Sequence, residues 1–175
     1  MSKPQEIVVR QSTPADFENW FALFEAVAAE GIWIGRESPL DQEDRRQAFH
    51  RVLEDDEAVT LVAEFGEHFV GVLGMEIRHG LAELGMMVDA RWRGRGVGSA
   101  LVQAAIAWAS EHGAHKICLV VWPHNAAARA LYKKFGFEQE GTFRRHYRRR
   151  NGELWDAIQM GLVLDKESPA SPRER

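Results

Sequence analysis

The 175-residue sequence is poor in cysteine, has no long apolar run and carries no large excess of positive charge. Its single cysteine, Cys118, excludes a disulfide-stapled fold and favours a small buried core residue in a reducing, cytoplasmic setting. No apolar run reaches the ~20 residues that cross a bilayer, and the opening MSKPQE is no signal peptide, so no membrane partner is expected. A formal net charge of -4 argues against nucleic acid as a partner. The histidines show no metal-ligand spacing, so no metal is expected.

The sequence does contain enough apolar material for one globular domain. Hydrophobic residues make up 45% of the chain, and their periodicity alternates between strand-like and helix-like along it. The resulting order, β-α-α-β-β-β-α-β-α-β-β, predicts one α/β domain over residues 1–165, with helices on both faces of a mixed, mostly antiparallel sheet of about seven strands. Residues 166–175 are polar, contain two prolines and are expected to form a disordered tail.

Turn and capping residues bound the expected elements. Pro14 and Asp41 are predicted to open the first two helices, and Asn125 is predicted to cap the last one. The strand–helix–strand unit between Leu81 and Trp122 is expected to form the parallel core of the sheet. Strands are expected over 7–10, 58–64, 69–78, 81–88, 117–122, 137–147 and 154–164, and the later helices over 96–112 and 126–135.

Between the strand expected over 81–88 and the helix that follows lies the basic, glycine-rich turn Arg93-Gly94-Arg95-Gly96-Val97-Gly98-Ser99. Glycines let a backbone come close to a ligand, because no Cβ intervenes. The first turn of a helix presents unpaired N–H groups and the positive end of the dipole, which together favour a phosphate group. Phosphate binding is therefore the favoured interpretation, and a strand-to-helix turn with solvated arginines is the alternative.

Two segments of the chain match motifs of a known superfamily. Arg93-x-x-Gly96-x-Gly98 resembles the acyl-CoA signature of the GNAT superfamily of N-acetyltransferases. The downstream segment Asn125-Ala126-Ala127-Ala128-x-x-Leu131-Tyr132-x-x-Phe135-Gly136-Phe137 resembles its second signature. The resemblance covers essentially residues 7–164, and the C-terminal stretch looks like the branch that contains amino-acid and other small-amine acetyltransferases. It implies an acetyl-CoA-dependent enzyme with splayed central parallel strands, and a possible homodimer.

The same resemblance implies where acetyl-CoA binds. The strand that ends at Val88 would part from the strand over 117–122, and the pantetheine arm would pair with the exposed backbone in the gap. An N–H near Val88 would face the thioester oxygen, and the side chain of Arg93 would point either back to the loop or to phosphate. The implied cofactor-binding residues are Met86, Met87, Val88, Arg93, Gly94, Arg95, Gly96, Val97, Gly98, Ser99, Asn125 and Tyr132.

Two side chains are candidates for proton transfer. Tyr132 occupies the position of the family's general acid; a free tyrosine titrates near ~10 and a thiol near ~8.5, so Tyr132 is expected to stay protonated at neutral pH. An aromatic that closes the core is the competing interpretation. Glu83, on the strand that leads to Val88, is the candidate base, although a solvated strand carboxylate is equally consistent with its position. Asp156 and Glu76 are weaker alternatives.

The acceptor is expected to be a primary amine of a small molecule, such as an amino acid or an amino-bearing antibiotic. The substrate-binding candidates are Phe24, Trp33 and Arg36, together with Phe21 and the last hairpin. The basic run over 144–150 is interpreted mainly as a solvated strand and hairpin. A protein N-terminus or lysine as the acceptor, and a non-catalytic acyl-CoA-binding domain, are the alternative functions.

Overall fold

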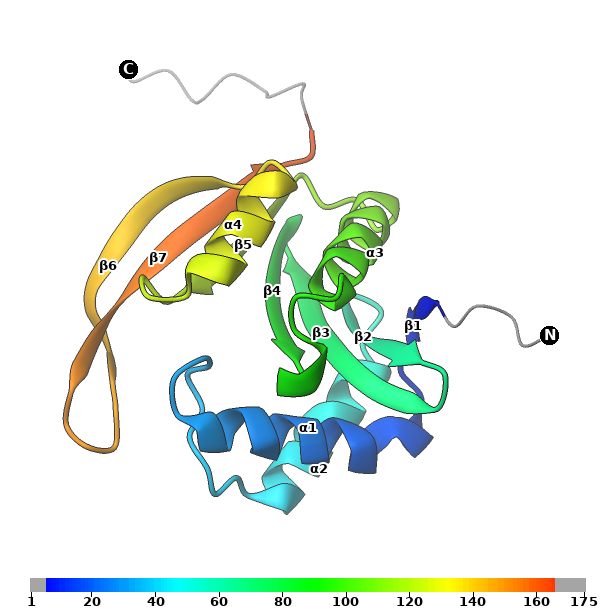
Figure 1. The fold of residues 1–175 in the computed structure, drawn as a ribbon. Helices are drawn as coiled ribbons and strands as arrows, with labels where there is room; N and C mark the ends of the chain where they lie inside the picture. The colour runs from blue at the N-terminus through cyan, green and yellow to red at the C-terminus, as the bar shows by residue number, and fades with distance from the viewer. Residues whose placement is uncertain (1–5, 166–175) are drawn as a thin grey trace.

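The computed structural model describes residues 6–165, so the tail predicted over 166–175 lies outside the described residues. The described residues form one α/β domain around a seven-stranded sheet with strand order β1-β2-β3-β4-β5-β7-β6 (Figure 1). Only β4 and β5 pair in parallel, and every other neighbouring pair is antiparallel. The predicted fold class is confirmed. The strands are β1 (Ile7–Gln11), β2 (Ala58–Phe65), β3 (His68–Arg78), β4 (Leu81–Val88), β5 (Lys116–Val121), β6 (Glu138–Arg148) and β7 (Leu154–Val163).

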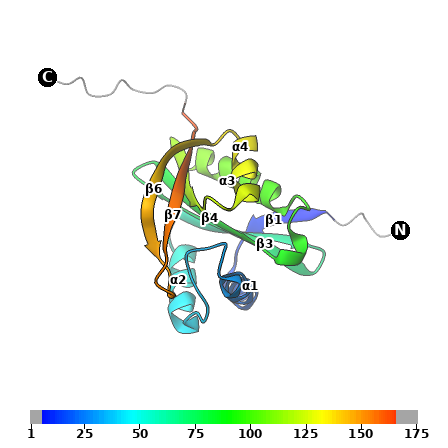
Figure 2. The same cartoon turned by 60° about the vertical axis from the view of Figure 1, so that its left-hand side comes forward.

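Helices cover both faces of this sheet. Figures 1 and 2 show α1 and α2 on one side and α3 and α4 on the other. The capping predictions hold for two of them, because the side chain of Asp41 accepts a hydrogen bond from the Asp44 N–H (2.9 Å) and Asn125 accepts one from the Ala128 N–H (3.1 Å). The helices are α1 (Phe17–Glu30), α2 (Gln42–Leu53), α3 (Val97–Glu111) and α4 (Ala126–Lys134), with short 3-10 turns η1 (Pro14–Asp16) and η2 (Ala90–Trp92).

The first α-helix begins later than predicted, at Phe17, because η1 comes between it and the first strand. Asp16 ends that turn as a buried carboxylate. It accepts hydrogen bonds from the main-chain N–H of Thr13 (2.7 Å) and from both terminal nitrogens of Arg10 (2.8 Å each). The Arg10 guanidinium lowers the pKa of Asp16 to about 2. This ion pair fastens the start of α1 to the edge of the sheet.

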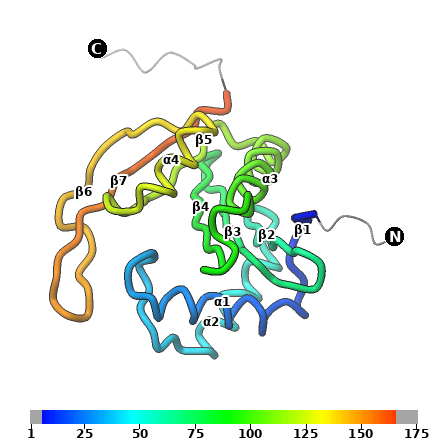
Figure 3. Tube along the Cα trace, viewed as in Figure 1, coloured from blue at the N-terminus to red at the C-terminus, as the bar shows by residue number. Residues whose placement is uncertain are grey.

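The central parallel pair is hydrogen-bonded over only part of its length. Leu81–Glu83 of β4 pairs with Lys116–Cys118 of β5, and no pairing follows. Beyond that point β4 stays with β3 as far as Val88, and β5 stays with β7 as far as Val121. The sheet therefore opens between β4 and β5. In the tube of Figure 3, β4 and α3 lie near the middle of the molecule.

Two apolar layers hold the domain together. The larger lies between the sheet and α3 with α4, and includes fully buried Leu73, Leu101 and Ile117. The smaller lies between the sheet and α1, where Val27 packs near Val72. Cys118 is free and buried, as predicted. None of the helices in the described part of the chain has the length and apolar character needed to cross a membrane.

The basic run over 144–150 is largely exposed and forms the end of β6 and the hairpin, as predicted, and Arg149 is the exception. Arg149 is buried, with 3% of its surface exposed. The strand β6 also contains a bulge, because Phe143 pairs with Ala157 and Tyr147 pairs with Trp155, which leaves three residues of β6 opposite one of β7. Such bulges bend a strand and re-aim the side chains that follow. Here the bulge turns the hairpin toward the connection between α1 and α2 (Figure 2).

Candidate active site

A cavity of about 480 Å³ occupies the opening between β4 and β5. Five parts of the chain form its wall: the end of β4, the turn into α3, the end of β5 with α4, α1 with the connection to α2, and Tyr147 of β6. A smaller hollow of about 340 Å³ adjoins the cavity and shares Leu84, Val120 and Tyr147 with it. The two spaces therefore adjoin at the point where the sheet opens.

The glycine-rich turn has the geometry of an anion-binding helix N-terminus. Gly94 and Gly96 have φ values of 73° and 88°, in the left-handed region that favours glycine. The Ala100 N–H donates to the Gly96 carbonyl at 3.0 Å, so the amides of the turn lie ahead of this bond of the helix ladder. A Cβ on Gly98 would lie 2.8 Å from Leu131, so this glycine lets α3 and α4 approach. The cavity wall includes Arg93, Gly94, Gly96, Gly98 and Ser99.

Arg91 and Arg93 are held by carboxylates. Arg91 pairs with Asp89 at 2.8 Å. Arg93 donates to both carboxylate oxygens of Glu30 (2.6 and 2.8 Å) and to the Val88 carbonyl (3.1 Å). This guanidinium, together with a smaller contribution from the indole N–H of Trp33, lowers the pKa of Glu30. The side chain of Arg93 therefore points to the end of α1 and the end of β4 rather than into the glycine-rich loop.

Two other predicted cofactor residues are not among the described residues that line the cavity. The guanidinium of Arg95 lies 5.3 Å from the ring centroid of Trp92, at the surface. Val97 is 1% exposed and belongs to the core beneath α3. Their contribution to a ligand is therefore limited to main-chain groups and, for Arg95, to positive charge near the turn.

The last five residues of β4 present main chain to the cavity. Pairing with β5 ends at Glu83, and all of Leu84–Val88 lines the cavity. Met86 packs against the α3 layer, whereas Met87 packs against the α1 layer. Peptide groups in this segment that point toward β5 have no strand partner on that side. An extended amide-bearing arm can pair with them as an added strand would.

Tyr132 reaches the cavity from α4, about two helical turns after the cap residue Asn125, which also lines it. The Tyr132 ring is 6% exposed and lies 5.5 Å from the Phe137 ring, between centroids. Burial raises the pKa of its phenol well above the ordinary value. The side chain is thus both part of the core and a protonated hydroxyl in the cavity wall.

Glu83 lines the adjoining hollow rather than the cavity. It is exposed, stands opposite Cys118 in the last parallel pair, and makes no hydrogen bond or ion pair with the described residues. The two weaker candidates have partners: Glu76 pairs with Arg78 at 3.1 Å, and Asp156 accepts a main-chain N–H of the β6 bulge at 2.7 Å. Of these three carboxylates, Glu83 is therefore the one without a partner among the described residues.

Of the three predicted substrate residues, Trp33 lines the cavity and the other two do not. The indole N–H of Trp33 donates to Glu30 at 2.6 Å, which orients the ring. Phe24 is half-buried on α1 and meets Trp20 edge-on, with 5.2 Å between ring centroids. Arg36 is exposed on the connection between α1 and α2.

Tyr147 lines both the cavity and the hollow, although it is not among the site residues predicted from the sequence. Its ring meets Trp122 edge-on at 4.7 Å, and a Cβ on Gly35 would lie 3.4 Å from it. Strand alternation along 137–147 could have assigned its face, but the bulge breaks that alternation. The sequence therefore contains no pattern that marks Tyr147 as a site residue, beyond its place at the end of the expected strand.

Open strands, a glycine-rich helix start and a buried tyrosine together define an acyl-CoA transferase site. Residues 18–137 match the Acetyltransferase (GNAT) family. The chain therefore belongs to this family and is an acetyltransferase, whose acetyl donor is acetyl-CoA, the co-substrate of the family. The family, the enzyme class and the co-substrate predicted from the sequence are confirmed.

Known relatives share the fold but differ in their acceptors. L-amino acid N-acetyltransferase AaaT of Escherichia coli (strain K12) is 40% identical over 109 residues, which cover 59% of this chain and 67% of that protein. The crystal structure of a ribosomal-protein-alanine N-acetyltransferase from Brucella melitensis has a TM-score of 0.83 and 28% identity, and the match covers 90% of this chain and 99% of that one. The structure of yncA from Salmonella typhimurium with its cofactor acetyl-CoA has a TM-score of 0.82, 20% identity and coverage of 93% and 96%.

Proposed function

We propose that the protein transfers the acetyl group of acetyl-CoA to the primary amine of a small molecule, and that an amino acid is the favoured acceptor. One observation carries this proposal: the cavity and the hollow adjoin at Leu84, Val120 and Tyr147, where β4 and β5 part. The donor occupies the part of the cavity between the turn into α3 and the strand opening. The acceptor end comprises the part of the cavity that Trp33–Gly35 and Tyr147 line, together with the hollow.

The charges around the two spaces disfavour a polycationic antibiotic as the acceptor. Among the described lining residues, Glu83 is the carboxylate, and Arg93 is already paired with Glu30. A polyamine or aminoglycoside would need several carboxylates for its several ammonium groups. Trp33 and Tyr147 instead supply aromatic surface for an apolar side chain.

The chemistry is a direct transfer in a ternary complex. The neutral amine nitrogen attacks the thioester carbon, the carbon–sulfur bond breaks, and the amine proton passes to Glu83 directly or through water. Main-chain N–H groups at the end of β4 stabilise the charge that develops on the thioester oxygen. Tyr132 donates its proton to the departing sulfur. The buried setting that raises the pKa of Tyr132 also raises the basicity of a thiolate formed beside it.

A protein acceptor is disfavoured by how the acceptor end is closed. The connection between α1 and α2 is fastened to the hairpin between β6 and β7 by hydrogen bonds from Arg149 and Arg150. A peptide chain would have to cross this fastened border, whereas a single small amine would not. The free, buried thiol of Cys118 is compatible with the reducing cytoplasm that we propose as the location.

Thiol release from acetyl-CoA tests this function when it is measured over a panel of amines. The panel contains apolar, acidic and basic amino acids, an aminoglycoside and a short peptide with a free N-terminus. Release that depends on amino acids with apolar side chains is expected. In the Glu83→Gln variant, the rate should fall at least about tenfold at neutral pH and lose its dependence on a basic group.

Other outcomes of this panel are informative. Release with the peptide alone would make the protein a protein acetyltransferase. Tight acetyl-CoA binding without release for any amine would make it a binding domain. An unchanged pH–rate profile in Glu83→Gln would assign the proton acceptor elsewhere.

A further inference from the structure

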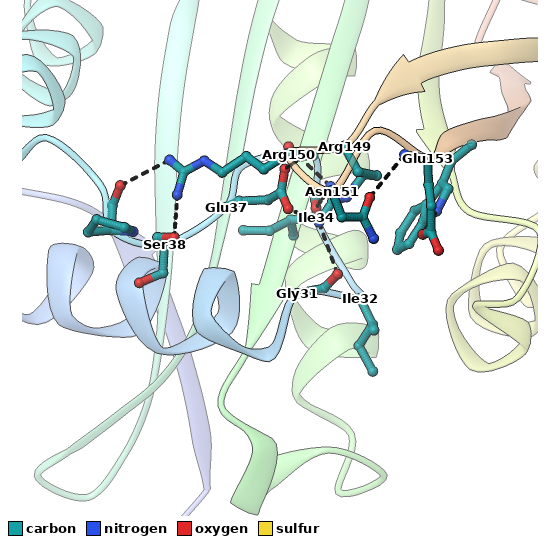
Figure 4. Close-up of polar contacts among 12 residues, drawn as sticks. Gly31, Ile32, Ile34, Glu37, Ser38, Arg149, Arg150, Asn151 and Glu153 are labelled. Carbon is teal, nitrogen blue, oxygen red and sulfur yellow. Dashed lines mark hydrogen bonds and ion pairs between the residues drawn. The ribbon is translucent and has the colours of Figure 1, made fainter.

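The hairpin between β6 and β7 grips the connection between α1 and α2 through one buried arginine (Figure 4). The Arg149 guanidinium donates to the main-chain carbonyls of Gly31 (2.9 Å), Ile34 (3.1 Å) and Gly35 (3.3 Å). These carbonyls lie more than 110 residues away in the sequence. A planar guanidinium with five donors suits such a task, because it can meet several acceptors at fixed directions.

A second arginine and one carboxylate extend this contact, which we name the clasp: Arg149 and Arg150 with the segment 31–39. Arg150 donates to the carbonyls of Ser38 and Pro39, the latter at 3.3 Å. Glu37 accepts the main-chain N–H of Arg150 at 2.9 Å and lies 3.5 Å from the Arg149 guanidinium. The segment is thus held at both of its ends and in the middle.

The clasp is continuous with the wall of the cavity. The Arg149 guanidinium lies over the ring of Trp155 at 4.4 Å and near that of Trp122 at 6.0 Å. Trp122 in turn meets Tyr147, whose ring would lie 3.4 Å from a Cβ added at Gly35. Trp33, Ile34 and Gly35 line the same cavity, and two of these residues, Ile34 and Gly35, supply carbonyls that accept hydrogen bonds from Arg149. The arginine itself is not among the described lining residues, so it acts on the site through these neighbours.

We propose that Arg149 is a positioning residue, which sets the shape of the acceptor end by holding Trp33–Gly35 against Tyr147. This inference rests on the function proposed above. Since β4 and β5 share no hydrogen bonds beyond Glu83, the clasp links the two halves of the sheet across the acceptor side of the opening. Without it, the segment moves away from Tyr147, and the acceptor loses a wall that the donor does not use.

The test compares Arg149→Met, Arg149→Lys and the control Arg148→Met, an exposed neighbour on the same hairpin. In Arg149→Met, the acceptor KM should rise about tenfold, whereas the Kd of acetyl-CoA measured by calorimetry stays within about twofold. Arg149→Lys should recover part of the loss, because an ammonium donates to fewer of the three carbonyls. Arg148→Met should behave as the unsubstituted protein.

Hydrogen exchange provides a readout that does not depend on activity. Amides over 31–40 should exchange faster in Arg149→Met than in Arg148→Met, with exchange in β2 and β3 unchanged. If Arg149→Met does not fold, Glu37→Gln replaces it, with a smaller shift in the same direction. Unchanged exchange over 31–40 overturns the clasp, as does a loss of acetyl-CoA affinity equal to the loss for the acceptor. A wild-type protein that acetylates no small amine refutes the proposed function, while the exchange result still decides the clasp.

Discussion

Among single side chains, Tyr132 makes the most direct test of the chemistry. Its ring packs against Phe137, and the residue is part of the wall of the cavity. Tyr132→Phe keeps the ring and removes only the proton donor. We expect kcat to fall about a hundredfold, because general acid catalysis typically contributes that much, while the Kd of acetyl-CoA changes less than about twofold.

Steady-state kinetics and calorimetry measure the two quantities, and circular dichroism checks that the fold is kept. The raised pKa of Tyr132 means that the unsubstituted enzyme should show no loss of rate from tyrosine ionisation near pH 10. A kcat for Tyr132→Phe equal to that of the parent protein would remove this hydroxyl from the mechanism.

Asp16 is a second side chain with a measurable consequence, in this case for stability. Its pKa is lowered to about 2, chiefly by Arg10, from an ordinary value of 3.8. A depressed carboxyl pKa stabilises the fold above the ordinary pKa, and that contribution is lost as the pH falls toward 2. Asp16→Asn should therefore lower the free energy of unfolding by about 1–2 kcal/mol at pH 7, since Arg10 is partly exposed to solvent.

Urea unfolding at pH 7 and at pH 3 measures this contribution, and the difference between the two proteins should shrink at pH 3. Glu18→Gln is the matched control, because Glu18 lies in the first turn of α1 but is 68% exposed in its pair with Arg46. Its substitution should cost less than about 0.5 kcal/mol. Equal losses for Asp16→Asn at both pH values would contradict the assigned ion pair.

Among the elements, the start of α3 is the one that we propose to bind the donor. Gly96 is the residue before the helix and has a φ of 88°, where an L side chain is strained by about 1–2 kcal/mol. Gly96→Ala should therefore displace the turn amides and raise the Kd of acetyl-CoA about tenfold. Gly113 at the other end of the helix has a φ of 75° and no atom within 4 Å of an added Cβ, so Gly113→Ala is the control.

Calorimetry on the two alanine variants separates strain from function. Both should lose stability by a similar amount, since the backbone conformation is similar. Only Gly96→Ala should lose affinity for acetyl-CoA. Equal affinities for the two variants would show that the turn at the start of α3 does not bind the diphosphate.

Elements with strong local signals were predictable from the sequence, and those set by distant partners were not. The apolar run of β5 and the glycines around α3 placed the parallel unit correctly. The start of α1 was placed three residues early, because Pro14 opens a 3-10 turn that the Asp16 pair with Arg10 then closes. The insertion of β7 between β5 and β6 depends on long-range pairing that local periodicity does not encode.

The donor half of the candidate site was more predictable than the acceptor half. Phosphate-binding turns and the motif around Tyr132 are local patterns, so residue spacing could reveal them. Tyr147 and Arg149 acquire their places from a bulge and from carbonyls of Gly31–Gly35. The carbonyls lie more than 110 residues away in the sequence, and the bulge depends on pairing with β7. A run of arginines alone suggests a solvated surface.

For the whole molecule, the opening of the sheet makes stability depend on the donor. Only Leu81–Glu83 and Lys116–Cys118 join β4 and β5, so the two halves share few main-chain hydrogen bonds. A ligand in the opening that contacts both halves binds the folded state alone. At a hundred times its Kd, acetyl-CoA should add about 2.7 kcal/mol, which raises the Tm by roughly 5–10 °C.

Thermal unfolding with increasing acetyl-CoA measures this shift, and S-acetylpantetheine at the same concentration is the control. It retains the arm that we propose to pair with Leu84–Val88 but lacks the diphosphate, so its shift should be much smaller. The shift for acetyl-CoA should also shrink in Gly96→Ala and persist in Gly113→Ala. Equal shifts for the two ligands would mean that the strand opening alone supplies the binding energy, and that the helix start, although shaped to bind a diphosphate, contributes none.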